Sequence, residues 1–177
     1  MTLGSLQHLL RAASALAEDC SFLICGSASL LASFPELGEP QAPLASTFDA
    51  DIFPQPFDEI TGRMLEEALG ETQSYHLRHG YHADILRTSI TQTLPKGWEQ
   101  RLIPVPKCNF AHALDPYDLA AIKVAIGRPK DMTLVKQLLE LKLLDVSLIR
   151  DRVEQLPLPV EFLPRIKARF RGLGVEG

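Results

Sequence analysis

The protein has 177 residues, of which 46% are hydrophobic and 23% are charged. This length suits one domain, or a small α/β domain with a helical addition, and the balance is typical of a globular protein rather than a disordered one. The formal net charge of −4 argues against a surface that binds nucleic acid everywhere, although it is compatible with a local basic patch.

The first half of the chain alternates helical and strand patterns, with apolar stripes at helical spacing and short apolar runs closed by Gly or Pro. The predicted elements are a helix over 5–17, a strand over 21–25, a helix after Gly26–Ser27, a loop over 35–46, a strand over 47–53 closed by Pro54 and Pro56, a helix over 58–69 with Ile60, Met64, Leu65 and Leu69 on one side, two strands around Gly80 within 74–86, and the strand "RLIPV" before Pro106.

The second half is helical. Residues 115–127 predict a helix with Asp115 as its N-cap, and a second helix follows with Asp131 as its N-cap. Two further helices are expected over 147–156 and 161–170. We therefore predict an α/β (α+β) fold: a small mixed sheet flanked by helices over 1–107, followed by a helical subdomain over 108–177.

Other global features point to a cytoplasmic protein. No apolar run approaches the length of a membrane-spanning helix, and no basic stretch precedes the N-terminal stripe as it would in a signal peptide. The three cysteines, Cys20, Cys25 and Cys108, lack C-x-x-C spacing, which favours reduced thiols.

Two aspartates, Asp49 and Asp51, lie one residue apart in the predicted strand 47–53. About two or three such pairs are expected by chance among 22 acidic residues and the chain has one, so the setting of the pair matters more than its presence. Residues i and i+2 of a strand share a face, and two carboxylates among apolar neighbours repel each other unless something compensates them. Either this face is an edge in water, or it binds a divalent metal such as Mg²⁺, which prefers carboxylate oxygens and substrate phosphates.

Two further features accompany the pair. Gly26 and Ser27 form a turn from a strand into a predicted helix, where free N–H groups and a hydroxyl could receive a phosphate. Asp84 is a single acid in a later predicted strand, and it can join the pair if the two strands are neighbours. Structural turns and solvated strand ends are the alternatives for both features.

In this order, the Gly-Ser turn, T-x-D-x-D and a later strand Asp resemble the DNA polymerase β-type nucleotidyltransferase superfamily. The segment "DPYDLAAIKVAIGRPKDMTLVKQLL" is similar to the helix-turn-helix of AbiEii-like nucleotidyltransferases, which include toxins of type IV toxin–antitoxin pairs, and of uncharacterised relatives. The resemblance covers about residues 20–140. The positions that match the family pattern in this segment are Asp118, Leu119, Lys123, Arg128, Lys130 and Asp131.

The resemblance implies transfer of a nucleoside monophosphate from an NTP such as ATP to an acceptor, RNA, tRNA or protein. It implies that Asp49, Asp51 and Asp84 hold Mg²⁺ or Mn²⁺, that Asp84 helps to remove the acceptor's proton, and that Lys123 is catalytic. It also implies nucleotide contacts, which are Gly26, Ser27, Lys123, Arg128, Lys130 and Asp131. An antitoxin protein would be a partner of a toxin, and no membrane is implied.

Alternatives stay open. The chain could be a catalytically inactive NTP-binding or interaction protein on the same fold, or an unrelated α/β domain whose acids are solvated. His76, His79 and His82 are spaced three apart, but a hairpin need not bring them together, so we do not predict a zinc site. The basic C-terminus around Arg165, Lys167 and Arg169 is typical of a solvated helix end, with contacts to RNA phosphates as the alternative.

Overall fold

The computed structural model describes residues 1–174, which form two compact units. The first unit contains Met1–Ile90 and Arg101–Asp115, and the second contains Thr91–Gln100 and the chain from Pro116 onward. The last three residues of the predicted subdomain 108–177 lie outside the described part of the chain.

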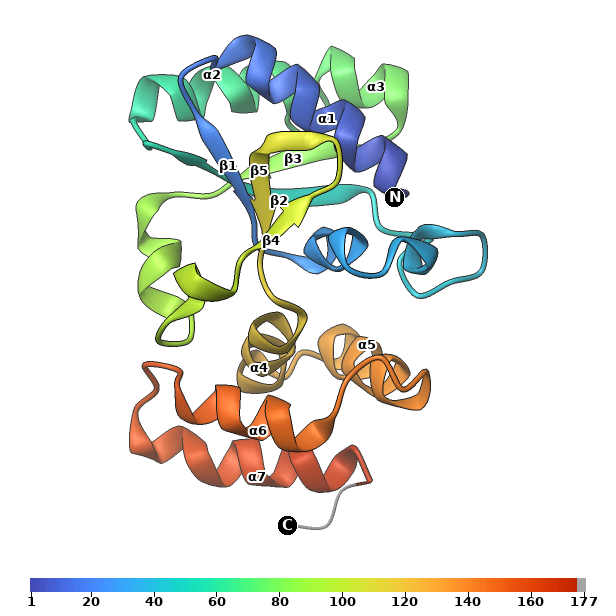
Figure 1. The fold of residues 1–177 in the computed structure, drawn as a ribbon, viewed down its shortest axis with the longest axis vertical. Coiled ribbons are helices and arrows are strands. Elements are labelled where there is room, and N and C mark those ends of the chain that lie inside the picture. Colours follow the sequence, from blue (N-terminus) through green and yellow to red (C-terminus); the bar gives the residue numbers. More distant parts are fainter. Residues whose placement is uncertain (175–177) are drawn as a thin grey trace. The chain divides into compact units, whose positions relative to one another are not determined.

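The first unit is built on one five-stranded mixed sheet in the order β3-β2-β1-β5-β4 (Figure 1). Its strands are β1 (Ser21–Ile24), β2 (Asp49–Gln55), β3 (His82–Ile85), β4 (Ile103–Val105) and β5 (Cys108–Ala113). β2 runs antiparallel to β1 and parallel to β3, while β5 runs parallel to β1 and antiparallel to β4. The predicted mixed sheet is confirmed, and β2, the strand with the two aspartates, lies inside it.

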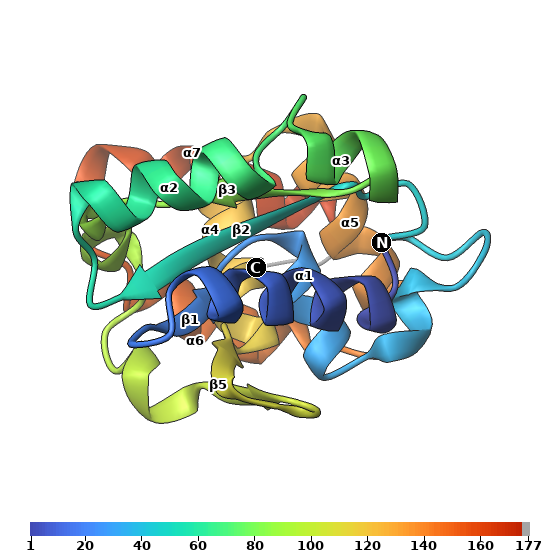
Figure 2. The same cartoon turned by 90° about the horizontal axis from the view of Figure 1, so that it is seen from above.

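Helices α1 (Leu3–Leu16) and α2 (Glu59–Leu69) pack against each other and against the sheet (Figure 2). Both begin at side-chain caps: Thr2 accepts the Ser5 N–H at 3.1 Å, and Asp58 accepts the N–H groups of Ile60 and Thr61. The apolar stripe of α1 is buried except for Leu16, which is 40% exposed, and α2 likewise buries only part of its predicted stripe. Leu65 and Leu69 are buried, but Ile60 is 83% exposed and Met64 37% exposed.

The prediction that Pro54 closes the strand is wrong, because β2 continues to Gln55 and Pro54 pairs with Phe22 of β1. The carbonyl of Asp51 accepts a hydrogen bond from Cys25 on the β1 side, and that of Ile52 accepts one from Leu86 on the β3 side. Backbone groups alternate in direction along a strand, so the nitrogen of Pro54 points to the β3 side. The ladder with β3 ends at Ile52 and Ile85, so the missing N–H of Pro54 breaks no ladder bond.

The prediction of two strands around Gly80 is wrong for the first of them. Residues Ser74–His79 form a short helix, α3, and only β3 after Gly80 is a strand. Gly80 has φ +77° and lies in the left-handed region, which ends a helix rather than turning a hairpin. Gln73 precedes the helix without a side-chain cap.

The sequence pattern does not predict the strand β5. It follows β4 through a tight turn at Pro106–Lys107, where Lys107 has φ +60°. Pro106 ends β4, as predicted, but the chain returns at once as β5 to pair with β1. Residues 108–113 therefore belong to the sheet of the first unit.

The second unit consists mainly of α4 (Pro116–Ile126), α5 (Pro129–Glu140), α6 (Val146–Glu154) and α7 (Leu163–Gly172), which confirms the predicted helical C-terminal part. α4 packs against the other three helices, and it is buried around most of its circumference. Short 3₁₀ helices accompany these elements, namely η3 (Thr88–Thr93), η4 (Trp98–Arg101) and η5 (Val160–Phe162).

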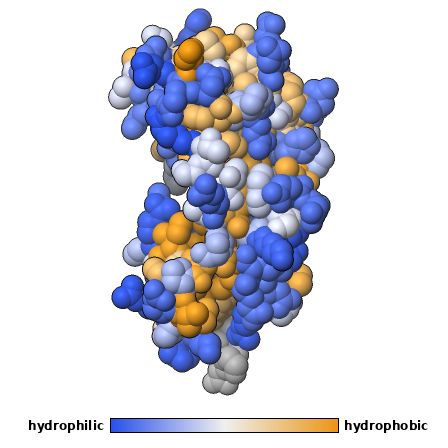
Figure 3. Space-filling model, turned by 90° about the vertical axis from the view of Figure 1, so that its left-hand side faces the viewer, coloured by the Kyte–Doolittle hydropathy of each residue, from blue (hydrophilic) through white to orange (hydrophobic). Residues whose placement is uncertain are grey.

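The surface of the second unit carries a group of apolar side chains (Figure 3). The exposed large apolar side chains of this unit include Val160 at 75%, Phe162 at 37% and Leu163 at 41%. Within residues 1–174, no helix combines the length and the apolar character needed to cross a membrane.

Candidate active site

The predicted acids come together on one face of two neighbouring parallel strands. Asp51 of β2 is the register partner of Asp84 of β3, and Asp49 is the partner of His82. Partners on neighbouring strands lie roughly 4.8 Å apart, and their side chains point to the same face. Asp49 and Asp51 are half-buried, and Asp84 is exposed. The condition under which Asp84 could join the acid pair, that their two strands are neighbours, is therefore met.

Gly26 lies directly against Asp51. A Cβ atom at position 26 would overlap Asp51 Oδ2 and would lie 2.6 Å from its Cγ. The backbone of Gly26 is extended, with φ −88° and ψ −161°, so space, not backbone freedom, requires glycine here. The same approach places Asp51 beside Cys25, and burial together with the charge of Asp51 raises the pKa of the Cys25 thiol to about 12. Cys25 is thus a buried neutral thiol at physiological pH.

Ser27 begins a 3₁₀ helix, η1 (Ser27–Ala32), rather than the predicted α-helix. The N-cap residue is Gly26, which has no side chain to accept a cap bond, and the Ser29 N–H donates to the Gly26 carbonyl at 2.9 Å. Ser29 is fully buried, and its hydroxyl has no hydrogen-bond partner among residues 1–174. The contact of Gly26 and Ser27 with a nucleotide stays a prediction.

His82 also lies on this face, although the sequence pattern does not predict it as a site residue. It is 7% exposed, and its Nε2 lies 3.4 Å from Asp84 Oδ1. The alternation of side chains in β3 could have identified it, because His82 and Asp84 are two residues apart and share a face. The spacing of three histidines drew attention to a zinc site instead. In the described part of the chain, no three His, Cys, Asp or Glu side chains converge as metal ligands.

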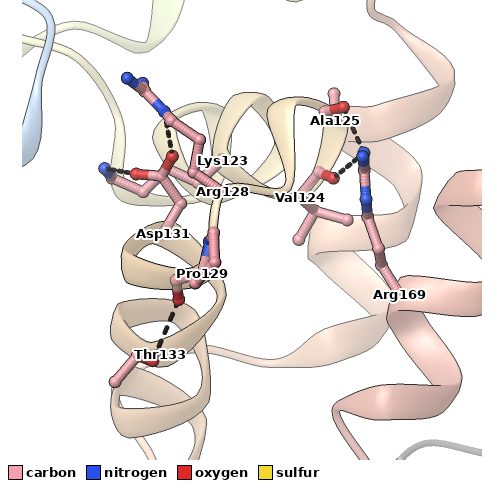
Figure 4. Close-up of polar contacts among 8 residues, drawn as sticks. All are labelled: Lys123, Val124, Ala125, Arg128, Pro129, Asp131, Thr133 and Arg169. Carbon is pink, nitrogen blue, oxygen red and sulfur yellow. Dashed lines mark hydrogen bonds and ion pairs between the residues drawn. The ribbon is translucent and has the colours of Figure 1, made fainter.

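In the second unit, Asp131 joins two of the predicted nucleotide contacts (Figure 4). Lys123 Nζ lies 2.7 Å from Asp131 Oδ1, and Arg128 Nε lies 2.8 Å from Oδ2. Asp131 is 1% exposed and Lys123 8%, whereas the side chain of Arg128 is 58% exposed. The charge of the buried Lys123 is therefore balanced by the buried carboxylate of Asp131.

The prediction that Asp131 caps its helix is wrong. α5 begins at Pro129 after Arg128, so Asp131 lies in the first turn, and its side chain is engaged by the two cations. Burial raises the pKa of Asp131, but the hydrogen bonds and charges of Lys123 and Arg128 outweigh burial and hold the pKa below its ordinary value. Lys130 is exposed beside this group. The nucleotide-binding role of Lys123, Arg128, Lys130 and Asp131 stays a prediction.

Other charged residues of the second unit act within it. Asp118, part of the family pattern, is fully buried and lies 3.1 Å from Arg152 Nε of α6. Arg169 donates from Nη1 to the carbonyls of Val124, at 2.9 Å, and Ala125, which are at the C-terminal end of α4 (Figure 4). The guanidinium of Arg169 thus caps the last carbonyls of α4. This geometry does not support the alternative in which Arg169 contacts RNA phosphates.

The comparison with known families identifies the chain. Residues 2–166 match the family described as "Nucleotidyltransferase of unknown function (DUF6036)". The chain belongs to this family. No curated protein and no solved structure matches it.

Membership in DUF6036 confirms the predicted nucleotidyltransferase resemblance at the level of the family. The match covers both units, from α1 to the start of α7. The finer resemblance to AbiEii-like toxins stays a prediction.

Proposed function

We propose that this DUF6036 protein transfers a nucleoside monophosphate from an NTP to an acceptor in a reaction that depends on Mg²⁺ or Mn²⁺. The observation that carries the proposal is the register of β2 and β3, in which Asp51 and Asp84 are partners. Asp49 lies two residues before Asp51 in β2, so its side chain is on the same face. The family description supports the reaction class.

The residues present fit a divalent metal. Asp51 and Asp84 offer oxygen donors from adjacent strands, and Gly26 leaves the space that the Asp51 carboxylate fills. Mg²⁺ is commonly bound by one or two carboxylates and completes its shell with water and substrate phosphates. A full cage of protein ligands is therefore not required, in accord with the lack of a converged three-residue group within residues 1–174.

Each residue has a part in the proposed reaction. Asp49, Asp51 and Asp84 would hold the metal, which when bound supplies positive charge to the phosphates and to the attacking oxygen. Asp84 has an exposed side chain, which suits a carboxylate that meets the acceptor hydroxyl and removes its proton. The backbone at Gly26–Ser27 lies next to Asp51, so it is the segment that we assign to the triphosphate.

The test combines binding with transfer. Purified protein is incubated with α-³²P-labelled NTPs, Mg²⁺ or Mn²⁺, and total cellular RNA or protein, and label transfer is followed by gel. We expect transfer that is lost in Asp51→Asn and Asp84→Asn. The matched control is Glu67→Gln, which removes an exposed carboxylate on α2.

Nucleotide binding separates the alternatives. The doubly substituted Asp49→Ala, Asp51→Ala protein should lose metal-dependent thermal stabilisation by NTPs. NTP binding without transfer to any acceptor would favour a catalytically inactive NTP-binding protein instead. Unchanged stabilisation in the double variant would exclude these aspartates as the metal site. A toxin role with an antitoxin partner is a further prediction, tested by growth arrest on expression that Asp51→Asn abolishes.

A further inference from the structure

We infer that His82 is a positioning residue that orients the Asp84 carboxylate, an inference that rests on the proposed function of Asp84. His82 precedes Asp84 by two residues in β3, and it lies beside Asp49 in the register of the two strands. It is thus the one histidine beside the three aspartates Asp49, Asp51 and Asp84 on this face of β2 and β3. Its burial, at 7% exposed, contrasts with the exposed Asp84.

The two side chains approach each other through one ring nitrogen and one carboxylate oxygen. His82 Nε2 lies 3.4 Å from Asp84 Oδ1, and the Asp84 side chain is 51% exposed. An exposed carboxylate can rotate, so a donor from a buried ring restricts it to fewer orientations. The second carboxylate oxygen then stays available to a metal or an acceptor hydroxyl.

The ring of His82 is itself held in place. Its centroid lies 4.6 Å from that of His76 in α3, and His76 Nδ1 accepts the Thr72 N–H at 3.1 Å. His82 is also fixed by its strand, between Tyr81 and Ala83. A donor on a rigid, packed ring orients its partner better than one on a mobile side chain.

The other ring nitrogen indicates the tautomer. Nδ1 of His82 is buried and has no hydrogen-bond partner among residues 1–174. A proton on Nδ1 would be a buried, unpaired donor, and it would leave the Nε2 lone pair facing a carboxylate. A proton on Nε2 would instead lie on the nitrogen that approaches Asp84 Oδ1 to 3.4 Å. The geometry therefore favours the Nε2–H tautomer, which is the form that can orient Asp84.

One experiment tests the contact independently of any reaction. Nitrogen-15 NMR of histidine-labelled protein distinguishes a protonated ring nitrogen from an unprotonated one. We expect His82 in the wild-type protein to carry its proton on Nε2, and Asp84→Ala to shift that Nε2 resonance. A proton on Nδ1, or an Nε2 resonance that Asp84→Ala leaves unchanged, would overturn the inference.

A second experiment measures Mn²⁺ binding in the presence of ATP, by electron paramagnetic resonance. His82→Phe keeps a buried ring but removes the donor, and His82→Gln keeps an N–H at a similar reach. Loss of such a supporting partner weakens metal binding by about 10–100-fold, so we expect that loss in His82→Phe and near wild-type binding in His82→Gln. The control His112→Phe changes a half-buried strand histidine of β5 and should bind as the wild type does.

The outcomes separate the two proposals. Mn²⁺ binding that is lost in Asp51→Asn but unchanged in His82→Phe overturns the positioning role alone. Equal weakening in His82→Phe and His82→Gln also overturns it, because packing would then be the cause. A wild-type protein that binds no Mn²⁺ with ATP overturns the proposed function and the inference with it. Thermal melts of each variant establish that it is folded, and the NMR measurement needs no His82 variant.

Discussion

Gly26 provides the sharpest test of the site, because a single methyl group should displace a predicted metal ligand. In Gly26→Ala the added Cβ would overlap Asp51 Oδ2 and approach its Cγ to 2.6 Å, against an ordinary contact of 3.4 Å or more. The extended backbone at position 26 is open to alanine, so the whole effect comes from the side chain. The Asp51 carboxylate must therefore move by more than 1 Å, and a misplacement of about 1 Å can already lower a catalytic rate by about 100-fold.

The assay compares stability with function. Overpacking of this kind costs about 1–3 kcal/mol in the free energy of unfolding, which urea titration measures. Label transfer and ATP-dependent Mn²⁺ binding should fall much further than stability does. Gly4→Ala is the matched control, because a Cβ there meets only Thr2 Oγ1 at 3.7 Å, and alanine inside α1 should stabilise the helix by about 0.5–1 kcal/mol.

The contrary result is equally clear. If Gly26→Ala binds Mn²⁺ and transfers label as the wild type does, the position of the Asp51 carboxylate is not important to the reaction. The assignment of Asp51 as a metal ligand would then be wrong.

Three further predictions concern the second unit. Asp131→Asn should lower the free energy of unfolding by about 3–5 kcal/mol in urea titrations, because it leaves Lys123 buried without its counter-charge. The double variant Lys123→Met, Asp131→Leu removes both charges and should recover most of this loss. Folding lowers the pKa of Asp131, so the stability that its carboxylate contributes is complete above its unfolded pKa of about 3.9 and is lost as the pH falls through the lower folded pKa. The free energy of unfolding should therefore fall less steeply with decreasing pH in Asp131→Asn than in the wild type. Gly127→Ala should cost about 1–2 kcal/mol or more in the same titration, because Gly127 has φ +69° and a Cβ would approach Arg169 Nη2 to 2.6 Å, and a loss of less than 0.5 kcal/mol would contradict the role of Arg169 at the end of α4.

The strand and helix predictions succeeded where local pattern and local turn chemistry agree. The apolar stripe of α1 and the apolar pattern of α2 are properties of neighbouring residues, so they could be read directly from the chain. α3 could not, because a helix of six residues is too short for its periodicity to be distinguished from that of a strand. Its stability depends on distant contacts, such as the stacking of Tyr75 on His8 of α1.

The candidate site divides in the same way. The sequence by itself indicated the acids Asp49, Asp51 and Asp84 and the family segment around Lys123, because residue types and their order along the chain carry that information. Only the tertiary structure decided which groups meet. Three contacts depend on the register of strands or the packing of helices: Gly26 with Asp51, His82 with Asp84, and Lys123 with Asp131. Register and packing are set by many distant contacts together, and no local pattern encodes them.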